Sequence, residues 1–162
     1  MKVIDNFFPI AVFKRIQEHI MSPGTGWYFQ ISVAAHTDKM AHSNYMYSHM
    51  AYEEHQPRSS LYEELLPLVN HPKFDVKSLM RIIVNSYPYT HELRKHEKHT
   101  DYEFSHKGAI LYLNTCDGYT WCEGEKIYSV ANRVLIHDPS IPHHSTTTTN
   151  AQRRVICNMN YL

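Results

Sequence analysis

The stretch GAILYLNTCDGYTWCEGEKIYSVANRVLIH, residues 108–137, consists of short runs rich in β-branched and aromatic residues, separated by turn-forming segments. Comparable runs precede and follow it, at residues 79–89 and 153–162. The chain from residue 79 onward therefore predicts six strands in succession. Because no helical pattern alternates with these strands, the sequence favours an antiparallel sandwich or jelly roll backed by helices over a parallel doubly wound sheet.

The first half of the chain carries the helical patterns. Residues 10–20 repeat apolar side chains at helical spacing after Pro9, and SPGTG at residues 22–26 ends this pattern. Ser60 and Glu63 match a capping box, which predicts a second helix over the following LYEELLPLV. We therefore expect two amphipathic helices ahead of the strands.

The segment between these helices is less regular. Residues 27–35 alternate as a strand does, whereas residues 36–57 show no clean period and indicate either a strand pair or a long covering loop. Neither a linker nor a repeat divides the chain, so we expect a single domain over residues 1–162. In this domain, residues 1–78 supply helical support and a lid, and residues 79–162 form the jelly-roll core.

Composition limits the classes of partner. Sixteen basic and sixteen acidic side chains cancel, so no net field recruits nucleic acid or an anionic membrane surface. No apolar run is long enough to span a bilayer. We expect a cytoplasmic protein without nucleic-acid or membrane partners. Cys116, Cys122 and Cys157 lack C-x-x-C spacing and are expected to be reduced thiols.

One short motif suggests a metal site. Within HEKHTDYE, His99 and Asp101 flank Thr100, and alternate side chains of a strand point the same way. A third ligand must come from elsewhere, and SIPHHSTTTT supplies His143 and His144 after a turn. Two histidines and a carboxylate on one face of a metal leave positions open, as in non-heme Fe(II) oxygenases. The H-x-D triplet alone is weak in a chain with 13 histidines, so the order of the surrounding motifs carries the interpretation.

That order resembles the Fe(II)- and 2-oxoglutarate-dependent dioxygenases, in their prolyl-4-hydroxylase-like branch. The resemblance rests on YPYTHELRKHEKHTDYE, AILYLNTCDGYTW, NRVLIHDPSIPHHSTTTTNAQRR and VICNMNY, within residues 79–162. It implies a double-stranded β-helix, Fe(II) as the metal, and 2-oxoglutarate and O2 as co-substrates. The implied reaction hydroxylates a C–H bond of a peptidyl (for example prolyl) or small-molecule substrate, with release of succinate and CO2.

The resemblance also implies the catalytic metal ligands. It makes His99 and Asp101 the first two ligands and favours His143 as the third, with His144 as the alternative. Ligand types alone also fit a zinc-dependent hydrolase or a non-catalytic metal-binding jelly roll.

The far carboxylate of 2-oxoglutarate needs a cation, and Arg153 and Arg154 compete for that role. On a strand, Arg154 shares its face with Ile156, Asn158 and Asn160, whereas Arg153 shares its face with apolar residues. The more polar face suits a co-substrate cavity, and the resemblance also selects Arg154. Arg153 is then expected to be a surface charge.

Further residues are expected to line the co-substrate pocket. The resemblance and the strand positions indicate Tyr87, Asn85, Tyr112 and Asn114. Leu111 stands where some members of the family carry a tyrosine that contacts the co-substrate. A pocket hydroxyl must therefore come from another residue or be absent.

Overall fold

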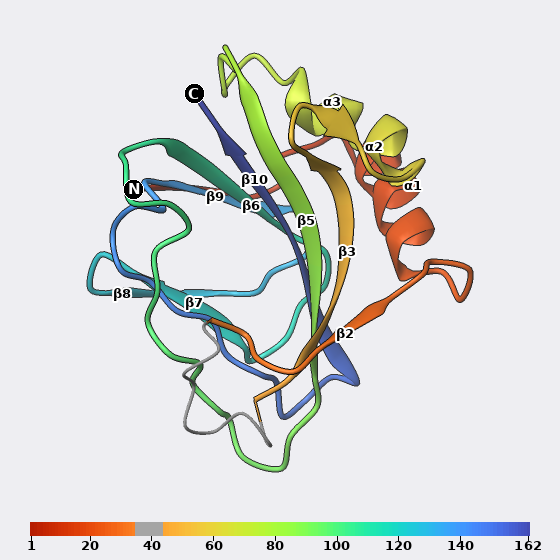
Figure 1. The fold of residues 1–162 in the computed structure, drawn as a ribbon. Helices are drawn as coiled ribbons and strands as arrows, with labels where there is room; N and C mark the ends of the chain where they lie inside the picture. The colour runs from red at the N-terminus through yellow and green to blue at the C-terminus, as the bar shows by residue number, and fades with distance from the viewer. Residues whose placement is uncertain (35–43) are drawn as a thin grey trace.

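A computed structural model describes residues 1–34 and 44–162 (Figure 1). In these ranges the chain forms a large antiparallel sheet, a smaller hairpin layer that faces it, and helices on the outer side of the large sheet. The elements in chain order are β1 (Lys2–Ile4), α1 (Ile10–Met21), β2 (Tyr28–Gln30), β3 (Met46–Glu53), β4 (Gln56–Pro57), α2 (Leu61–Glu64), α3 (Leu66–Val69), β5 (Leu79–Pro88), β6 (Lys107–Tyr112), β7 (Tyr119–Cys122), β8 (Glu125–Tyr128), β9 (Arg133–His137) and β10 (Arg153–Tyr161).

The strand order is that of a jelly roll. The large sheet follows β1-β9-β6-β10-β5-β3-β2, with β4 paired to β3, and its neighbouring strands are antiparallel. The facing layer contains the β7–β8 hairpin. Bridges from Trp121 to His144 and from His99 to His143 extend this layer with segments outside the regular strands. The predicted jelly roll backed by helices is confirmed.

Most of the predicted elements are present. The six strands expected from residue 79 onward are β5 to β10, and the first helix is α1. The strand expected over residues 27–35 is only β2, three residues long. Residues 35–43 lie outside the described ranges, and the described remainder of 36–57 contains the β3–β4 hairpin. A strand pair is thus found in that part of the segment.

The second predicted helix is interrupted. It forms two four-residue helices, α2 and α3, and the side chain of Ser60 makes no capping hydrogen bond. Pro67 lies in the first turn of α3. Because proline has no backbone N–H and its ring displaces the preceding turn, it cannot continue α2. The prediction of one capped helix was therefore wrong, although both short helices still bury leucines against the sheet.

The N-terminal half contributes strands as well as helices. β1 pairs with β9 at one edge of the large sheet, and β3 pairs with β5 near the other edge. Residues 1–78 therefore complete the sheet in addition to supporting it, and their role as a lid stays a prediction. None of the helices in the described ranges is long and apolar enough to cross a membrane.

The large sheet separates two apolar clusters. The larger cluster lies on the helix side and includes Phe13, Ile16, Ile20, Leu65, Leu68, Val84, Leu111, Val155, Cys157 and Met159. The smaller cluster lies between the two layers and consists of Tyr87, Ile110, Tyr112, Cys122, Ile127, Leu135 and Ile156. Alternate residues of β10 thus face opposite ways, as expected for a strand covered on both faces. The three cysteines are free and buried.

Candidate metal centre and co-substrate pocket

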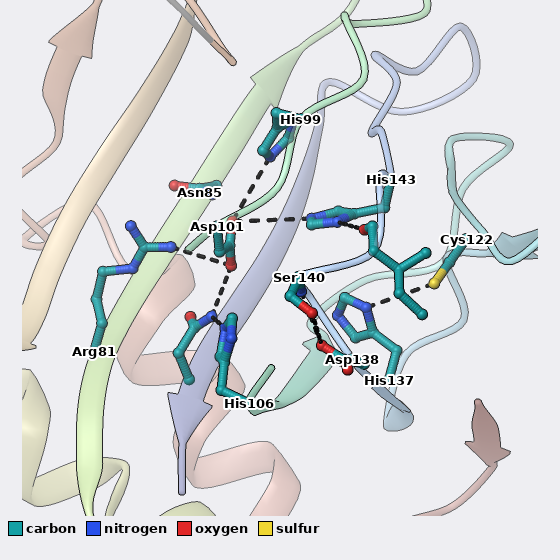
Figure 2. A network of polar contacts seen from close by, with 12 residues as sticks. Arg81, Asn85, His99, Asp101, His106, Cys122, His137, Asp138, Ser140 and His143 are labelled. Carbon is teal, nitrogen blue, oxygen red and sulfur yellow. Dashed lines mark hydrogen bonds and ion pairs between the residues drawn. The ribbon is translucent and has the colours of Figure 1, made fainter. Parts of the chain in front are cut away.

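His99, Asp101 and His143 meet between the two layers (Figure 2). The backbones of His99 and His143 hydrogen-bond to each other in both directions, at 2.9 and 3.0 Å, which places the two rings side by side. Oδ1 of Asp101 lies 3.8 Å from Nε2 of His99 and 3.9 Å from Nε2 of His143. The ligand atoms of the three residues lie within 4.8 Å of one another.

The second oxygen of Asp101 is fixed by other residues. Oδ2 lies 3.2 Å from Nη2 of Arg81 and accepts a hydrogen bond of 2.8 Å from Nδ2 of Asn160. Burial alone would raise the pKa of Asp101, but Arg81 and the Asn160 hydrogen bond outweigh burial and hold that pKa below its usual value. Asp101 is therefore an ionised carboxylate with one oxygen directed at the histidines.

Backbone carbonyls orient the two histidine rings. Nδ1 of His143 lies 3.0 Å from the carbonyl of Ile141, and Nδ1 of His99 lies 3.3 Å from that of Glu97. If each Nδ1–H donates to its carbonyl, the Nε2 of each ring keeps a lone pair that can bind a metal between the histidines and Asp101. Burial also lowers the pKa of His143, which favours the neutral ligand form.

This arrangement fits a divalent metal. Ligand atoms on one face of an octahedral ion lie about 3 Å apart when the metal–ligand distance is about 2.1 Å. The 3.8 and 3.9 Å separations to Asp101 therefore require only a small contraction to bind an ion. Two imidazoles and one carboxylate match the facial ligand set of non-heme Fe(II) sites, although Zn(II) accepts the same ligand types.

His144 does not belong to this group. Its ring stacks on Trp121, with centroids 5.6 Å apart and an interplanar angle of 12°. The ammonium of Lys98 lies 4.0 Å from the centroid of the same indole. Nδ1 of His144 lies 3.1 Å from the carbonyl of Ser145. Of the adjacent histidines, the structure thus brings His143, and not His144, to His99 and Asp101.

A cavity of about 200 Å³ adjoins the three residues. Asn85 and Tyr87 line it, as the sequence predicted, and Val33, Ala34 and Met46 line it from the N-terminal half. Drug-sized ligands occupy pockets of about 300–1,000 Å³. The smaller volume suits a compact dicarboxylate and one small substrate group.

Arg154 is fully buried behind Thr120 and Ser145, which line this cavity. Its guanidinium donates hydrogen bonds to the hydroxyls of Thr120 and Ser145 at the cavity wall, and also to the hydroxyl of Ser129 and the carbonyl of Thr146. Within residues 1–34 and 44–162, no carboxylate forms an ion pair with Arg154. Because a buried charge without a counter-ion is costly, this site favours an anionic ligand.

Two tyrosines flank the same guanidinium. The Cζ atom of Arg154 lies 5.3 Å from the ring centroid of Tyr87 and 5.7 Å from that of Tyr112. Both tyrosines are buried, and burial raises the pKa of Tyr112 to about 12, so its hydroxyl keeps its proton. Leu111 faces the helices instead. The hydroxyl-bearing residue beside the arginine on β6 is therefore Tyr112.

Two sequence predictions require correction. Asn114 does not reach the cavity, because its amide donates to the carbonyl of Arg153 at 2.8 Å and accepts from the N–H of Val155 at 2.9 Å. It therefore anchors the start of β10. Arg153 is half-buried and not a free surface charge: Nη2 donates to the carbonyl of Met21 at 3.0 Å, and the guanidinium stacks over Trp27.

Sequence reasoning missed several residues around the metal centre. Arg81 and Asn160 contact Asp101, and they face each other across β5 and β10. His137 lies edge-on to His143, with centroids 5.1 Å apart, and its Nδ1 lies 3.5 Å from Sγ of Cys122. Burial lowers the pKa of His137 to about 3. Strand parity placed Asn160 on the face of Arg154, but its contact with Asp101, like the positions of the other residues, depends on how strands pair.

Comparisons with known proteins define the class of fold. No protein-family model matches the chain, and no curated protein matches it. Among solved structures, it is similar to a Pseudomonas putida prolyl-4-hydroxylase, with TM-score 0.62, 11% identity and coverage of 99% of this chain and 91% of the other. It is also similar to a Trichoplax adhaerens prolyl hydroxylase solved with a hypoxia-inducible-factor peptide, with TM-score 0.61, 15% identity and coverage of 99% and 82%.

A third similar structure is SnoN from nogalamycin biosynthesis, described as a non-heme α-ketoglutarate-dependent epimerase, with TM-score 0.64, 10% identity and coverage of 99% and 77%. At these identities the likeness establishes the fold. The chain has the fold of prolyl hydroxylases and related 2-oxoglutarate oxygenases, as the resemblance predicted.

Proposed function

We propose that the protein is an Fe(II)- and 2-oxoglutarate-dependent oxygenase that hydroxylates a C–H bond of a peptidyl or small-molecule substrate and releases succinate and CO2. The observation that carries this function is the pairing of two sites. His99, Asp101 and His143 offer three ligand atoms within 4.8 Å, and the adjoining cavity ends at residues that cover Arg154, a buried cation with no carboxylate partner among the described residues.

Each of these residues has a distinct part in the reaction. Nε2 of His99, Nε2 of His143 and Oδ1 of Asp101 would hold the metal, while Arg81 keeps the carboxylate of Asp101 ionised and oriented. When bound, Fe(II) and 2-oxoglutarate supply the oxidising chemistry that converts O2 and a C–H bond to a hydroxyl group. The protein positions the reactants and excludes water.

Arg154 binds the far carboxylate of 2-oxoglutarate. A guanidinium can donate two parallel hydrogen bonds to a carboxylate, and the hydroxyls of Ser145 and Thr120 now occupy the donors nearest the cavity. Rotation of the Ser145 and Thr120 side chains about χ1 would move these oxygens away and let the carboxylate replace them. The dianion then neutralises a buried cation that has no other carboxylate partner in the described ranges.

The substrate class is supported by similarity alone. The Trichoplax adhaerens structure contains a peptide fragment, which favours a peptidyl substrate, with a prolyl side chain as one candidate. The resemblance of the fold to the SnoN epimerase keeps a small-molecule substrate open.

Anaerobic titration tests this function. Addition of 2-oxoglutarate to the Fe(II)-loaded protein is expected to produce a weak visible charge-transfer band, and admission of O2 is expected to yield succinate. His99→Ala and Asp101→Asn remove the band, whereas His91→Ala, which changes an exposed histidine, keeps it.

Each alternative gives a different result. A folded protein without the band contradicts the oxygenase assignment. A band without succinate formation indicates a non-catalytic metal-binding module. Hydrolysis supported by Zn(II), with no need for O2 or 2-oxoglutarate, indicates a zinc-dependent hydrolase.

A further inference from the structure

Several polar atoms on one wall of the cavity lack hydrogen-bond partners among residues 1–34 and 44–162. They are Nε of Arg81 and the Oδ1 atoms of Asn85, Asn158 and Asn160, and all four residues line the cavity. A buried polar group without a partner loses its hydration and gains nothing in exchange. Such groups are rare in folded proteins, and several in one cavity indicate a missing ligand.

Strand pairing places these atoms in one strip. Arg81 and Asn160 are directly opposite each other on β5 and β10, and Asn85 is opposite Ile156. Asn158 is opposite Ile83, so it is a diagonal neighbour of Asn85, at a spacing of about 7–8 Å. Figure 2 shows Arg81 and Asn85 beside Asp101. The strip therefore runs along the cavity wall next to the metal ligands.

The amide orientation of Asn160 is determined by its partners. Nδ1 of His106 lies 2.9 Å from the carbonyl of Phe104 and donates to it, which leaves Nε2 as an acceptor. Nδ2 of Asn160 lies 3.0 Å from that Nε2 and 2.8 Å from Oδ2 of Asp101. The amide nitrogen thus uses both of its hydrogens, and the orphaned atom is an acceptor oxygen.

The orphaned acceptors do not suit 2-oxoglutarate. At neutral pH this dianion has carboxylate and keto oxygens and no hydrogen-bond donor. It cannot satisfy the oxygens of Asn158 and Asn160. These oxygens require N–H or O–H donors, which water supplies in the ligand-free chain and a substrate can supply in its place.

Charge narrows the class of that substrate. Arg81 is paired with Asp101, and in the proposed complex Arg154 is paired with 2-oxoglutarate, so neither arginine needs an anionic group from the substrate. Nε of Arg81 needs an acceptor, whereas the asparagine oxygens need donors. A neutral primary carboxamide supplies two N–H donors and one carbonyl acceptor. We infer that the oxygenase proposed above takes a carboxamide-bearing substrate, such as an asparaginyl or glutaminyl side chain, with the carboxamide bound along the strip of Arg81, Asn85, Asn158 and Asn160.

Peptide binding tests this inference, which rests on the proposed function. The protein is loaded with redox-silent Mn(II) and 2-oxoglutarate, and dissociation constants are measured by calorimetry for Gly-Asn-Gly, Gly-Leu-Gly and Gly-Pro-Gly. Leucine matches the shape of asparagine without its polar atoms. We expect Gly-Asn-Gly to bind about tenfold more tightly than Gly-Leu-Gly. Equal affinity, or tightest binding of Gly-Pro-Gly, overturns the inference.

Substitutions test which residues cause the preference for Gly-Asn-Gly over Gly-Leu-Gly. Asn158→Leu and Asn85→Leu are each expected to bring the ratio of the two affinities close to one, whereas Asn70→Leu, at an exposed position, keeps it. Because each cavity substitution removes an unsatisfied oxygen, it is also expected to raise the melting temperature of the ligand-free chain. A lowered melting temperature with an unchanged affinity ratio in both variants contradicts the inference.

The proposed function and this inference fail in different ways. Loss of the Fe(II)–2-oxoglutarate band in the unaltered chain overturns the function and the inference together. A band without preference for Gly-Asn-Gly overturns only the carboxamide assignment.

Discussion

Arg81 lies behind Asp101, with Nη2 3.2 Å from Oδ2, the oxygen that does not face the histidines. Arg81 is the strongest of the groups that lower the pKa of Asp101. In Arg81→Met this pKa rises, so the carboxylate becomes protonated at a higher pH and binds metal less well. We expect Mn(II) affinity to fall about 10–100-fold, most strongly at acidic pH.

The measurement is the Mn(II) dissociation constant between about pH 5 and 8, the range in which most proteins are most stable. Arg58→Met is the matched control, because Arg58 pairs with Glu54 at the surface, far along the chain from the metal ligands. Identical pH profiles for the two variants would show that Arg81 does not influence the carboxylate.

The adjacent histidines provide a second test. His143→Ala removes one ligand atom and is expected to weaken metal binding about 100-fold or more. His144→Ala removes a ring stacked on Trp121, so metal affinity should change less than about threefold. Equilibrium dialysis with Fe(II) under anaerobic conditions measures both values. Equal losses in the two variants would contradict the ligand set.

The adjacent arginines Arg153 and Arg154 provide a third test. In Arg154→Met, 2-oxoglutarate loses its cationic partner and should no longer stabilise the chain. In Arg153→Met the contacts with Met21 and Trp27 are lost, so the chain is destabilised but 2-oxoglutarate still raises its melting temperature. At a concentration 100 times its dissociation constant, 2-oxoglutarate is expected to stabilise a chain that binds it by about 2.7 kcal/mol, and Arg154→Met should lose this stabilisation. Thermal shift assays with and without 2-oxoglutarate distinguish the two variants.

Local sequence patterns predicted the features that follow from strand periodicity, such as the face of a strand on which a side chain lies. Arg154 was placed on the inner face of β10 because a strand alternates its side chains, and that placement agrees with the structure. For the third ligand the resemblance favoured His143, but local pattern could not exclude His144, because both histidines follow the same turn. Only the bridge between His99 and His143, which joins segments far apart in the chain, distinguishes them.

Tertiary contacts explain the remaining failures. Arg81 and Asn160 meet Asp101 only because β5 and β10 pair in one particular register, which a single sequence does not reveal. Ser60 has the pattern of a helix cap, but Pro67 shortens the helix that it was expected to begin. Asn114 was assigned to the pocket because of its strand position, whereas its side chain binds the backbone of β10.

Gly118 supports Arg154 through close packing. A Cβ atom at this position would lie 2.5 Å from Cδ of Arg154 and 2.6 Å from the carbonyl oxygen of Thr147. Since the carbonyl cannot move freely, Gly118→Ala displaces the arginine. We expect a loss of about 1–3 kcal/mol in the free energy of unfolding and weaker binding of 2-oxoglutarate.

Gly26→Ala is the control for this substitution, because no atom of the described residues lies within 4 Å of the added Cβ atom. Urea unfolding and a 2-oxoglutarate titration should both leave it close to the unaltered chain. An equal effect of the two substitutions would mean that the contact with Arg154 does not matter.

His96 is expected to make the ligand-free chain sensitive to acid. It is 3% exposed, neither ring nitrogen has a hydrogen-bond partner in the part of the chain that the structure describes, and burial, aided by the charge of Arg154, lowers its pKa to about 3. In the unfolded chain the pKa is about 6.5, so between these values the unfolded state binds more protons. The free energy of unfolding therefore falls as the pH drops below about 6.5, by about 2 kcal/mol from this residue at pH 5.

His96→Phe removes this contribution, so the loss of stability between pH 7 and pH 5 should be about 2 kcal/mol smaller than in the unaltered chain. Urea unfolding at the two pH values, with a chelator present to keep the chain metal-free, measures the difference. His91→Phe, at an exposed position, should show the full acid sensitivity. The expected difference between the variants comes from a ring that stays neutral in the folded chain. If both variants lose the same free energy of unfolding between pH 7 and pH 5, His96 is protonated in the folded chain.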